Sequence, residues 1–225
     1  EADLGVPLLR RLSRGVEANL VGRQLAATLD DAFARIVQGV LQARRGDRTG
    51  ILTVSVDPSF AVRWLVLRLG RFRAANPEID LRLAATEALA DFDREDVDMA
   101  IRHGRGGWPG LDAERLMSAR MFPVCSRGLL AGSPPLSQPA DLRHHTLLHE
   151  DNGEHWRAWL AKANAGTVDA GRGPRFDDAH LTLAAAGASQ GVALADDALV
   201  AADLMDGRLV RLFDVEIATD HGYWL

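Results

Sequence analysis

From residue 51 onward, short β-rich runs alternate with longer helical runs, and no other feature constrains the fold as much. The β-rich runs are ILTVSV (51–56), IDLRLAA (79–85), DMAIRHG (98–104), FPVCS (122–126), TLLH (146–149), GVALA (191–195) and LVRLF (209–213). Alternation of this kind predicts an α/β fold with mainly parallel sheets. Between the second and third runs, LADFDREDV (89–97) is expected to form a short helix.

The amino-acid composition of the chain changes after FPVCS. The segment SRGLLAGSPPLSQPADLRHH (126–145) is rich in proline, glycine and serine. Such a segment indicates that the chain leaves one subdomain for another. We therefore expect two lobes with a cleft between them.

A long amphipathic helix is expected from Gly22 to Arg45, because this segment lacks proline and carries an apolar stripe. The stripe consists of Leu25, Leu29, Phe33, Ile36 and Val40. An exposed stripe of this length is usually buried against a partner helix, so dimerisation is favoured over packing on the chain's own domain. The charged, glycine-containing segment ARRGDRTG (43–50) then indicates a linker or hinge.

Composition and charge disfavour several classes of protein. The net charge of −5 gives no global attraction to nucleic-acid phosphates, although a local basic patch remains compatible with DNA contact. The single cysteine, Cys125, excludes an internal disulfide framework and suits a reducing compartment. No segment approaches the roughly 20 apolar residues of a membrane span, so a cytoplasmic protein with no membrane contact is expected.

Motifs for catalysis and for metal binding are not found. The sequence contains neither a Gly-x-Ser-x-Gly elbow nor a P-loop, and the histidines at 144, 145, 149 and 155 match no zinc spacing. We therefore expect no catalytic residue, no metal and no cofactor.

Two strand-to-helix turns are candidates for binding a small polar molecule. At the first, Pro58 favours a first helical turn, and Ser59 is expected to cap a helix from Phe60 to Arg73, with or without a ligand contact. At the second, RFDDAHLTLAAA (175–186), Asp177 or Asp178 is expected to cap a helix. Helix N-termini beyond the carboxyl ends of strands are where α/β sheets bind ligands. Two such turns facing each other would bracket a small molecule.

The third β-rich run ends in Arg102 and His103, just before the glycine-rich loop GRGGWPG (104–110). An arginine fork suits a carboxylate or a phosphate, and glycines allow the backbone to approach a ligand closely. A salt bridge from Arg102 to Asp96 or Asp98 is the structural alternative. Ligand contact is slightly favoured, and together with the helix N-termini it suggests a small ligand that bears a carboxylate.

The order of several blocks resembles that of the LysR-type transcriptional regulators. EADLGVPLLRRLSRG (1–15) is similar to the passage from the recognition helix into the wing of that family. The later blocks agree in the same order, and they are FAVRWLVLRLGRFRAANPEIDLRL (60–83), DVDMAIRHGRGGWPGL (96–111), FPVCS (122–126), PADLRHHTLLH (139–149), GVALADDALV (191–200), GRLVRLFD (207–214) and YWL (223–225). The resemblance is strongest to the glycine-cleavage activator and β-lactamase regulator subgroup.

The resemblance implies a fold and a division into domains. The fold would be α/β, with two Rossmann-like lobes resembling periplasmic binding proteins, preceded by a linker helix and a remnant of a winged helix-turn-helix. The remnant would span residues 1–21, and the linker and dimerisation helix with its hinge would span 22–49. Effector lobe I would comprise 50–125 plus 206–225, and lobe II would comprise 126–205. Asn19 would replace the family's usual threonine cap before the linker helix.

The resemblance also implies ligand-binding residues. They are Ser59, Phe60, Asp91, Arg102, His103, Asp178 and Tyr223, of which Asp91 and Tyr223 rest on the resemblance alone. Typical members have tyrosine where His103 stands.

The implied partners are a small-molecule effector, DNA through an N-terminal domain that mostly precedes Glu1, and a second copy of the chain, with pairing of dimers into tetramers left open. A solute-binding protein of a transporter is the alternative with the same two-lobed architecture.

Overall fold

The computed structural model describes residues 8–11, 16–24 and 50–225. Strands β1 (Leu9–Arg11) and β2 (Val16–Ala18) form a short antiparallel pair. Helical structure starts at Leu20, and the side chain of Asn19 accepts a hydrogen bond from the Gly22 amide at 2.9 Å, as expected of a cap. The predicted dimerisation stripe, Leu25, Leu29, Phe33, Ile36 and Val40, lies outside the described residues, so that linker helix and the winged remnant stay predictions.

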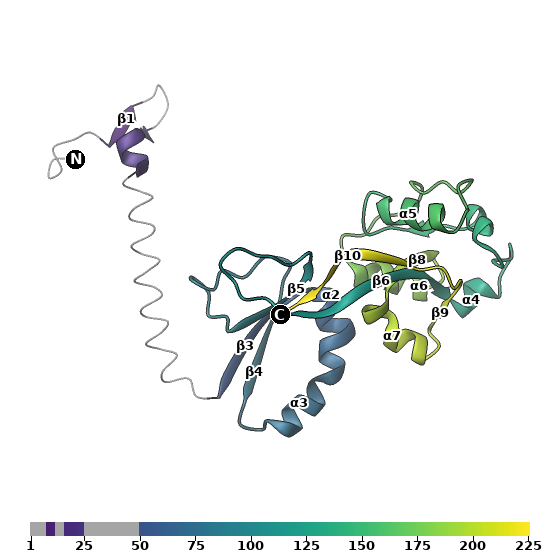
Figure 1. The fold of residues 1–225 in the computed structure, drawn as a ribbon, viewed down its shortest axis with the longest axis horizontal. Helices are drawn as coiled ribbons and strands as arrows, with labels where there is room; N and C mark the ends of the chain where they lie inside the picture. The colour runs from purple at the N-terminus through teal and green to yellow at the C-terminus, as the bar shows by residue number, and fades with distance from the viewer. Residues whose placement is uncertain (1–7, 12–15, 25–49) are drawn as a thin grey trace.

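An eight-stranded sheet organises residues 50–225, in the order β4-β3-β5-β10-β6-β8-β7 with β9 also paired to β6 (Figure 1). The strands are β3 (Ile51–Val56), β4 (Asp80–Ala85), β5 (Met99–Gly104), β6 (Arg115–Ser126), β7 (Leu147–Leu148), β8 (Val192–Asp196), β9 (Leu209–Arg211) and β10 (Ile217–Trp224). All seven predicted β-rich runs contain a strand of this sheet.

The sheet is mixed, which corrects the expectation of mainly parallel sheets. β3 pairs in parallel with β4 and β5, and β7 with β8. The pairs of β10 with β5 and β6, and of β6 with β8 and β9, are antiparallel. Among the predicted runs, FPVCS covers only the end of β6 and none covers β10, because polar residues interrupt the apolar pattern in the rest of these long strands.

These two long strands join the halves of the sheet. The end of β10 pairs with β5 at Gly222–Trp224, whereas its start pairs with β6 near Met121. β6 in turn pairs with β8 through residues 121–124. β6 and β10 therefore run from the half that contains β3, β4 and β5 into the half that contains β7, β8 and β9. The precise domain boundaries stay a prediction.

Helices cover both faces of the second half. The helical elements after β6 are α4 (Arg127–Leu130), η3 (Pro139–His144), α5 (Glu154–Lys162), α6 (Ala179–Gly187) and α7 (Asp197–Met205). One core contains Leu183 of α6 and Leu199 of α7, and a second core on the other face contains Trp156 and Trp159 of α5. Figure 1 shows α5 on one side of the strands, with α6 and α7 on the other. Side chains of β6 and β8 alternate between the two cores, which explains why their runs are almost wholly apolar.

The helical run after β3 is continuous but irregular. It comprises α2 (Pro58–Phe60), a π turn (Ala61–Leu65), a 3-10 turn (Val66–Arg68) and α3 (Leu69–Ala75). Asp57 caps it by accepting a hydrogen bond from the Phe60 amide at 2.9 Å. The prediction that Ser59 is the cap is therefore wrong, because Ser59 already lies inside the first turn.

The predicted helix at 89–97 is absent as well, since this segment forms turns. The carbonyl of Asp91 accepts hydrogen bonds from the Arg94 and Glu95 amides at 3.0 and 2.8 Å, and the turn goes no further. In the described part of the chain, no helix is long and apolar enough to cross a membrane.

Candidate functional site

A cleft of about 240 Å³ lies where the two halves of the sheet meet. The parallel strands direct their carboxyl ends toward it: Asp57 follows β3, Glu150 follows β7, and Asp196 ends β8. Met121 of β6 and Tyr223 of β10 line the same space. A cleft beyond the carboxyl ends of parallel strands is the usual binding place in α/β sheets.

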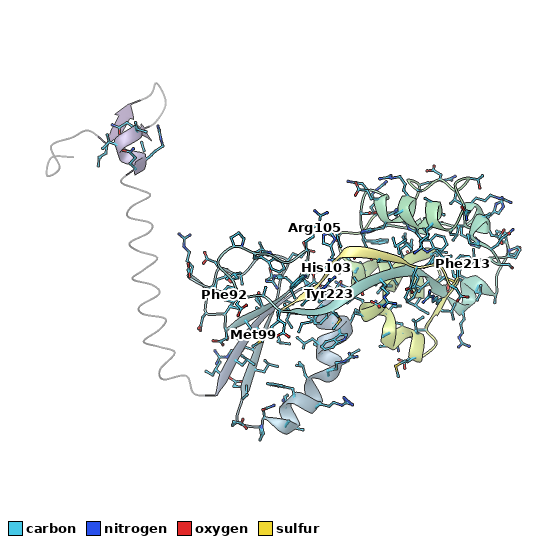
Figure 2. The ribbon with its side chains drawn as sticks, in the orientation of Figure 1. Phe92, Met99, His103, Arg105, Phe213 and Tyr223 are labelled. Carbon is cyan, nitrogen blue, oxygen red and sulfur yellow. The ribbon has the colours of Figure 1, made fainter. Side chains whose placement is uncertain are left out.

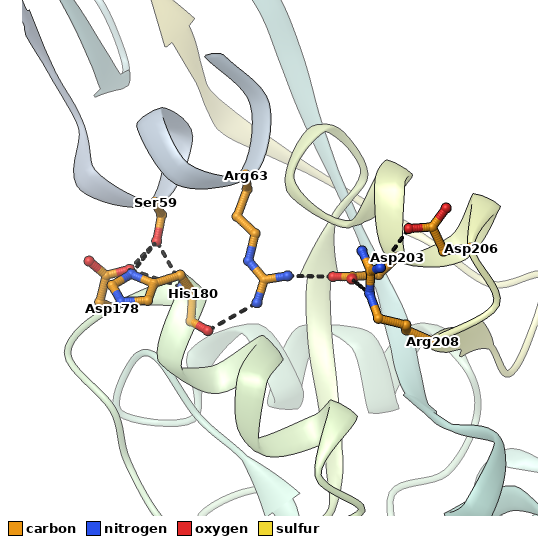
Figure 3. A network of polar contacts seen from close by, with 7 residues as sticks. All are labelled: Ser59, Arg63, Asp178, His180, Asp203, Asp206 and Arg208. Atoms are coloured by element: carbon orange, nitrogen blue, oxygen red, sulfur yellow. Dashed lines mark hydrogen bonds and ion pairs between the residues drawn. The ribbon is translucent and has the colours of Figure 1, made fainter. Parts of the chain in front are cut away.

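The first turn of α2 and the start of α6 meet at this cleft, as the two predicted turns require (Figure 3). The Ser59 hydroxyl donates a hydrogen bond to the Asp178 carboxylate and accepts one from the His180 amide at 2.8 Å. Asp178 is the cap of α6, because its side chain accepts from the His180 amide at 3.0 Å. A residue from the first half of the sheet is thereby tied to a residue 119 positions away in the second half.

A second link between the halves lies behind the first. Arg63 donates a hydrogen bond to the Asp203 carboxylate on α7 and another to the carbonyl of His180 at 3.1 Å. Asp203 also pairs with Arg208 at 2.6 Å, so this buried carboxylate has two cationic partners (Figure 3).

Aromatic rings form one wall of the cleft. The ring of Tyr223 lies 5.0 Å from that of His103 and 4.5 Å from that of Phe60, measured between centroids. His103 and His221 stack at 5.3 Å. Figure 2 shows His103 and Tyr223 beside each other where the two halves join. Phe60 is fully buried, so it supports Tyr223 from behind rather than facing the cleft.

The protonation of the cleft is perturbed. Burial, reinforced by the charges of Asp196 and Asp178, raises the pKa of Glu150 to about 8. Burial also raises the pKa of Asp196 to about 7 and lowers the pKa of His103. Burial opposes ionisation of Asp178 too, but hydrogen bonds from Ser59 and His180 outweigh it and lower the pKa of Asp178. Buried carboxyl groups with raised pKa values are typical of functional sites.

Of the predicted ligand-binding residues, the structure brings four together at the cleft: Ser59, His103, Asp178 and Tyr223. Phe60 lies just behind them. Asp91 is exposed and lies 3.8 Å from the guanidinium of Arg94, away from the cleft lining. The ligand-binding role of the set stays a prediction.

Arg102 lies on the opposite face of the strand from His103, because consecutive strand residues point to opposite sides. Its guanidinium donates to the Ser55 hydroxyl and to the Ala88 carbonyl, both at 2.6 Å. It borders a separate cavity of about 850 Å³ that is also lined by Trp108 and Trp224. Arg102 therefore does not line the cleft. It cross-links β5, β3 and the loop between β4 and β5.

Most of the acidic residues that line the cleft were not predicted from the sequence. Asp57, Glu150 and Asp196 all face the cleft, as does the histidine at 155. Each of the three acids follows or ends a predicted parallel strand, so an acidic residue at a strand's carboxyl end was the available signal. In residues 8–11, 16–24 and 50–225, no group of three histidine, cysteine or acidic side chains is placed to hold a metal ion.

The fold and this cleft define a two-part α/β domain with a small polar cleft at the junction of its halves, the architecture of domains that bind small molecules. Residues 45–225 match the family model of the LysR substrate binding domain. The chain therefore belongs to the LysR-type transcriptional regulators, and it contains the effector-binding domain of such a regulator.

Similar proteins agree with this assignment. The chain is 36% identical over 225 residues to the glycine cleavage system transcriptional activator of Escherichia coli (strain K12), covering 100% of this chain and 74% of that protein. It is 36% identical over 226 residues to the HTH-type transcriptional activator AmpR of Pseudomonas aeruginosa, covering 100% of this chain and 75% of that protein. The solved effector domain of the Pseudomonas aeruginosa AmpR superposes with a TM-score of 0.66 at 36% identity, covering 78% of this chain and 84% of that one. These relatives are transcriptional regulators and not enzymes, which confirms the predicted family and class.

Proposed function

We propose that a small-molecule effector binds in the cleft lined by Ser59, His103, Asp178 and Tyr223 and thereby controls transcription. The observation that carries this proposal is the pair of hydrogen bonds by which Ser59 reaches Asp178 and His180 across the junction of the two halves. A ligand that competes for these groups changes how the halves are held together. In typical allosteric systems such coupling amounts to about 1–3 kcal/mol.

The output of this coupling would pass through the segment that precedes residue 50. We propose that this segment forms a dimerising linker helix that carries the change to a DNA-binding domain. As a DNA-binding regulator, the protein would act in the cytoplasm. Pairing of dimers into tetramers is compatible with this arrangement.

In the sequence, Arg102 and the helix N-termini suggest an effector that bears a carboxylate. That premise is not met at the cleft, because Arg102 is tied to Ser55 and Ala88 on the other face of the sheet. The helix N-termini at the cleft do not support a carboxylate either, since α2, α6 and α7 are capped by Asp57, Asp178 and Asp196.

A variant that fills the cleft tests the proposed function. Ala179 lines the cleft at the start of α6, whereas Ala184 is exposed on the same helix. Compounds that raise the melting temperature of the wild-type chain in a metabolite screen should also stabilise Ala184→Phe, but they should not stabilise Ala179→Phe. Circular dichroism of both variants checks that they fold. Equal stabilisation of the two would show that the compounds bind elsewhere.

A solute-binding protein of a transporter remains the alternative architecture, but no specific observation favours it. The relatives named above match the whole of this chain, and they are transcriptional regulators.

A further inference from the structure

The cleft between the two halves has a one-sided charge. Its lining contains six carboxyl groups and neither lysine nor arginine, and the six are Asp57, Glu87, Glu150, Asp177, Asp178 and Asp196. Three histidines, at 103, 155 and 221, complete the titratable lining. An anionic ligand would therefore meet like charge on several walls, with no cationic side chain among the lining residues to offset it.

Three of these carboxyl groups are already engaged. Asp57, Asp178 and Asp196 each accept a hydrogen bond from an amide of the helix that they begin, at 2.9, 3.0 and 2.8 Å. They hold the positive ends of three helices, so these helix ends are not free to bind an anion. Their charges nevertheless face the cleft.

Glu150 differs from these caps. It follows β7, lines the cleft and is enclosed enough that burial dominates its titration. Within the described residues, its side chain takes part in no hydrogen bond or ion pair. The charged groups that act on it are the carboxylates of Asp196, Asp178, Asp151 and Asp57. Glu150 is half-buried, and a carboxyl group surrounded by like charge and without a partner is stabilised by a ligand of opposite charge.

We propose that the cleft binds a small organic cation, a primary ammonium or guanidinium compound, whose charged group sits beside Glu150 and Asp196. This inference rests on the proposed function and narrows the chemistry of its effector. An organic cation fits better than a metal ion, since no group of three ligating side chains converges anywhere in the described ranges. A cleft of about 240 Å³ is small for a binding site, so the ligand is a small molecule.

The protonation of the cleft gives this proposal a distinct signature. Burial and the charges of Asp196, Asp178, Asp151 and Asp57 raise the pKa of Glu150 to about 8, so its carboxyl group keeps its proton near neutral pH. A bound cation would favour the ionised form of Glu150, so binding at pH 7 would release a proton. The imidazoles of His103, His155 and His221 face the same space.

The test is calorimetry of the 225-residue chain with three compounds of similar shape: 1,4-diaminobutane, adipate and 1,4-butanediol. We expect saturable binding of the diamine, with weaker or no binding of adipate and of the diol. Repeating the titration at pH 7 in two buffers of different ionisation enthalpy should reveal proton release. Glu150→Gln should weaken diamine binding about ten-fold or more, since it removes one charged partner. Glu78→Gln, the same change at an exposed position, should have no effect.

Circular dichroism establishes whether Glu150→Gln folds, and Asp196→Asn serves as the second variant because asparagine retains the cap of α7. Diamine binding that is no tighter than binding of adipate or the diol overturns the inference, as does diamine affinity unchanged in both cleft variants. Tight binding of adipate in place of the diamine would overturn the charge assignment while leaving the effector cleft standing. The proposed function itself is refuted only if ligands stabilise Ala179→Phe and Ala184→Phe equally. Failure of the charge assignment can therefore be distinguished from failure of the proposed function.

Discussion

Ser59 and Asp178 are 119 residues apart in the chain, yet the hydroxyl of the first donates a hydrogen bond to the carboxylate of the second (Figure 3). Asp178 begins a helix in one half of the sheet, and Ser59 lies in the first turn of a helix that belongs to the other half. Both residues line the cleft, so this bond places a pair of polar groups where an effector would compete for them.

Removing the Ser59 hydroxyl should weaken the junction of the two halves. We expect Ser59→Ala to lower the free energy of unfolding by about 1–2 kcal/mol, because Asp178 and the His180 amide both lose a partner. The pKa of Asp178 should rise as well. Urea unfolding measures the first effect, with Ser137→Ala at an exposed position as the control. Equal losses in the two variants would show that the bond contributes nothing.

The pair formed by Arg63 and Asp203 should matter more than an exposed pair. Asp203→Asn is expected to destabilise the chain by about 2 kcal/mol, because Arg63 and Arg208 would both lose a buried anionic partner. The same change at the exposed Asp206, which also contacts Arg208, should cost less than about 0.5 kcal/mol. Thermal or urea unfolding of the two variants side by side decides between them, and similar losses would contradict a role for burial.

The raised pKa of Glu150 makes stability depend on pH in a defined direction. Below the ordinary glutamate range, the carboxyl group carries a proton in both the folded and the unfolded chain. Between that range and the folded-state pKa of about 8, only the folded chain keeps the proton, so the free energy of unfolding falls as pH rises. Asp196, with a pKa raised to about 7, acts in the same sense.

Glu150→Gln should remove its share of this dependence. The stability of the variant relative to wild type should increase from pH 5 to pH 8, with a slope of at most about 1.4 kcal/mol per pH unit. Urea unfolding across this range measures it, and Glu78→Gln is the matched control. A difference between variant and wild type that stays constant with pH would contradict the buried, protonated state.

Arg102 is expected to contribute to stability and not to effector binding. Arg102→Ala should lower the free energy of unfolding by about 2–3 kcal/mol, since the buried Ser55 hydroxyl and the Ala88 carbonyl each lose a donor. Arg105→Ala, which removes an exposed pair with Asp220, should change stability by less than about 1 kcal/mol. Calorimetry of the folded Arg102 variant should show unchanged affinity for any ligand of the cleft, and a large loss of affinity would restore Arg102 as a binding residue.

The apolar stripe before residue 50 should control oligomeric state. We expect Leu29→Glu to raise the dimer dissociation constant roughly a hundred-fold, because a charge would have to be buried between partner helices. Arg35→Glu, off the stripe, should leave the dimer intact. Sedimentation velocity separates these outcomes, and a wild-type chain that sediments as a monomer would refute dimerisation through this segment.

The strands and the starts of the helices were predictable because they depend on residues that are close together in the sequence. The runs that became β3 and β8 are mostly apolar, and proline and aspartate mark the turns at 57–59 and 177–178, so these strands and helix starts follow from neighbouring residues alone. The order of the sequence blocks shared with LysR-type regulators also indicated the family.

Only the tertiary structure decided which side chains share the cleft. Arg102 and His103 are neighbours in sequence, but the alternation of a strand sends one to a structural cross-link and the other to the cleft. Glu150 and Asp196 lie far apart in the chain and become neighbours because β7 pairs with β8 in parallel, which brings the carboxyl ends of both strands to one edge. Contacts of this kind depend on strand pairing between distant segments, and no local pattern encodes that pairing.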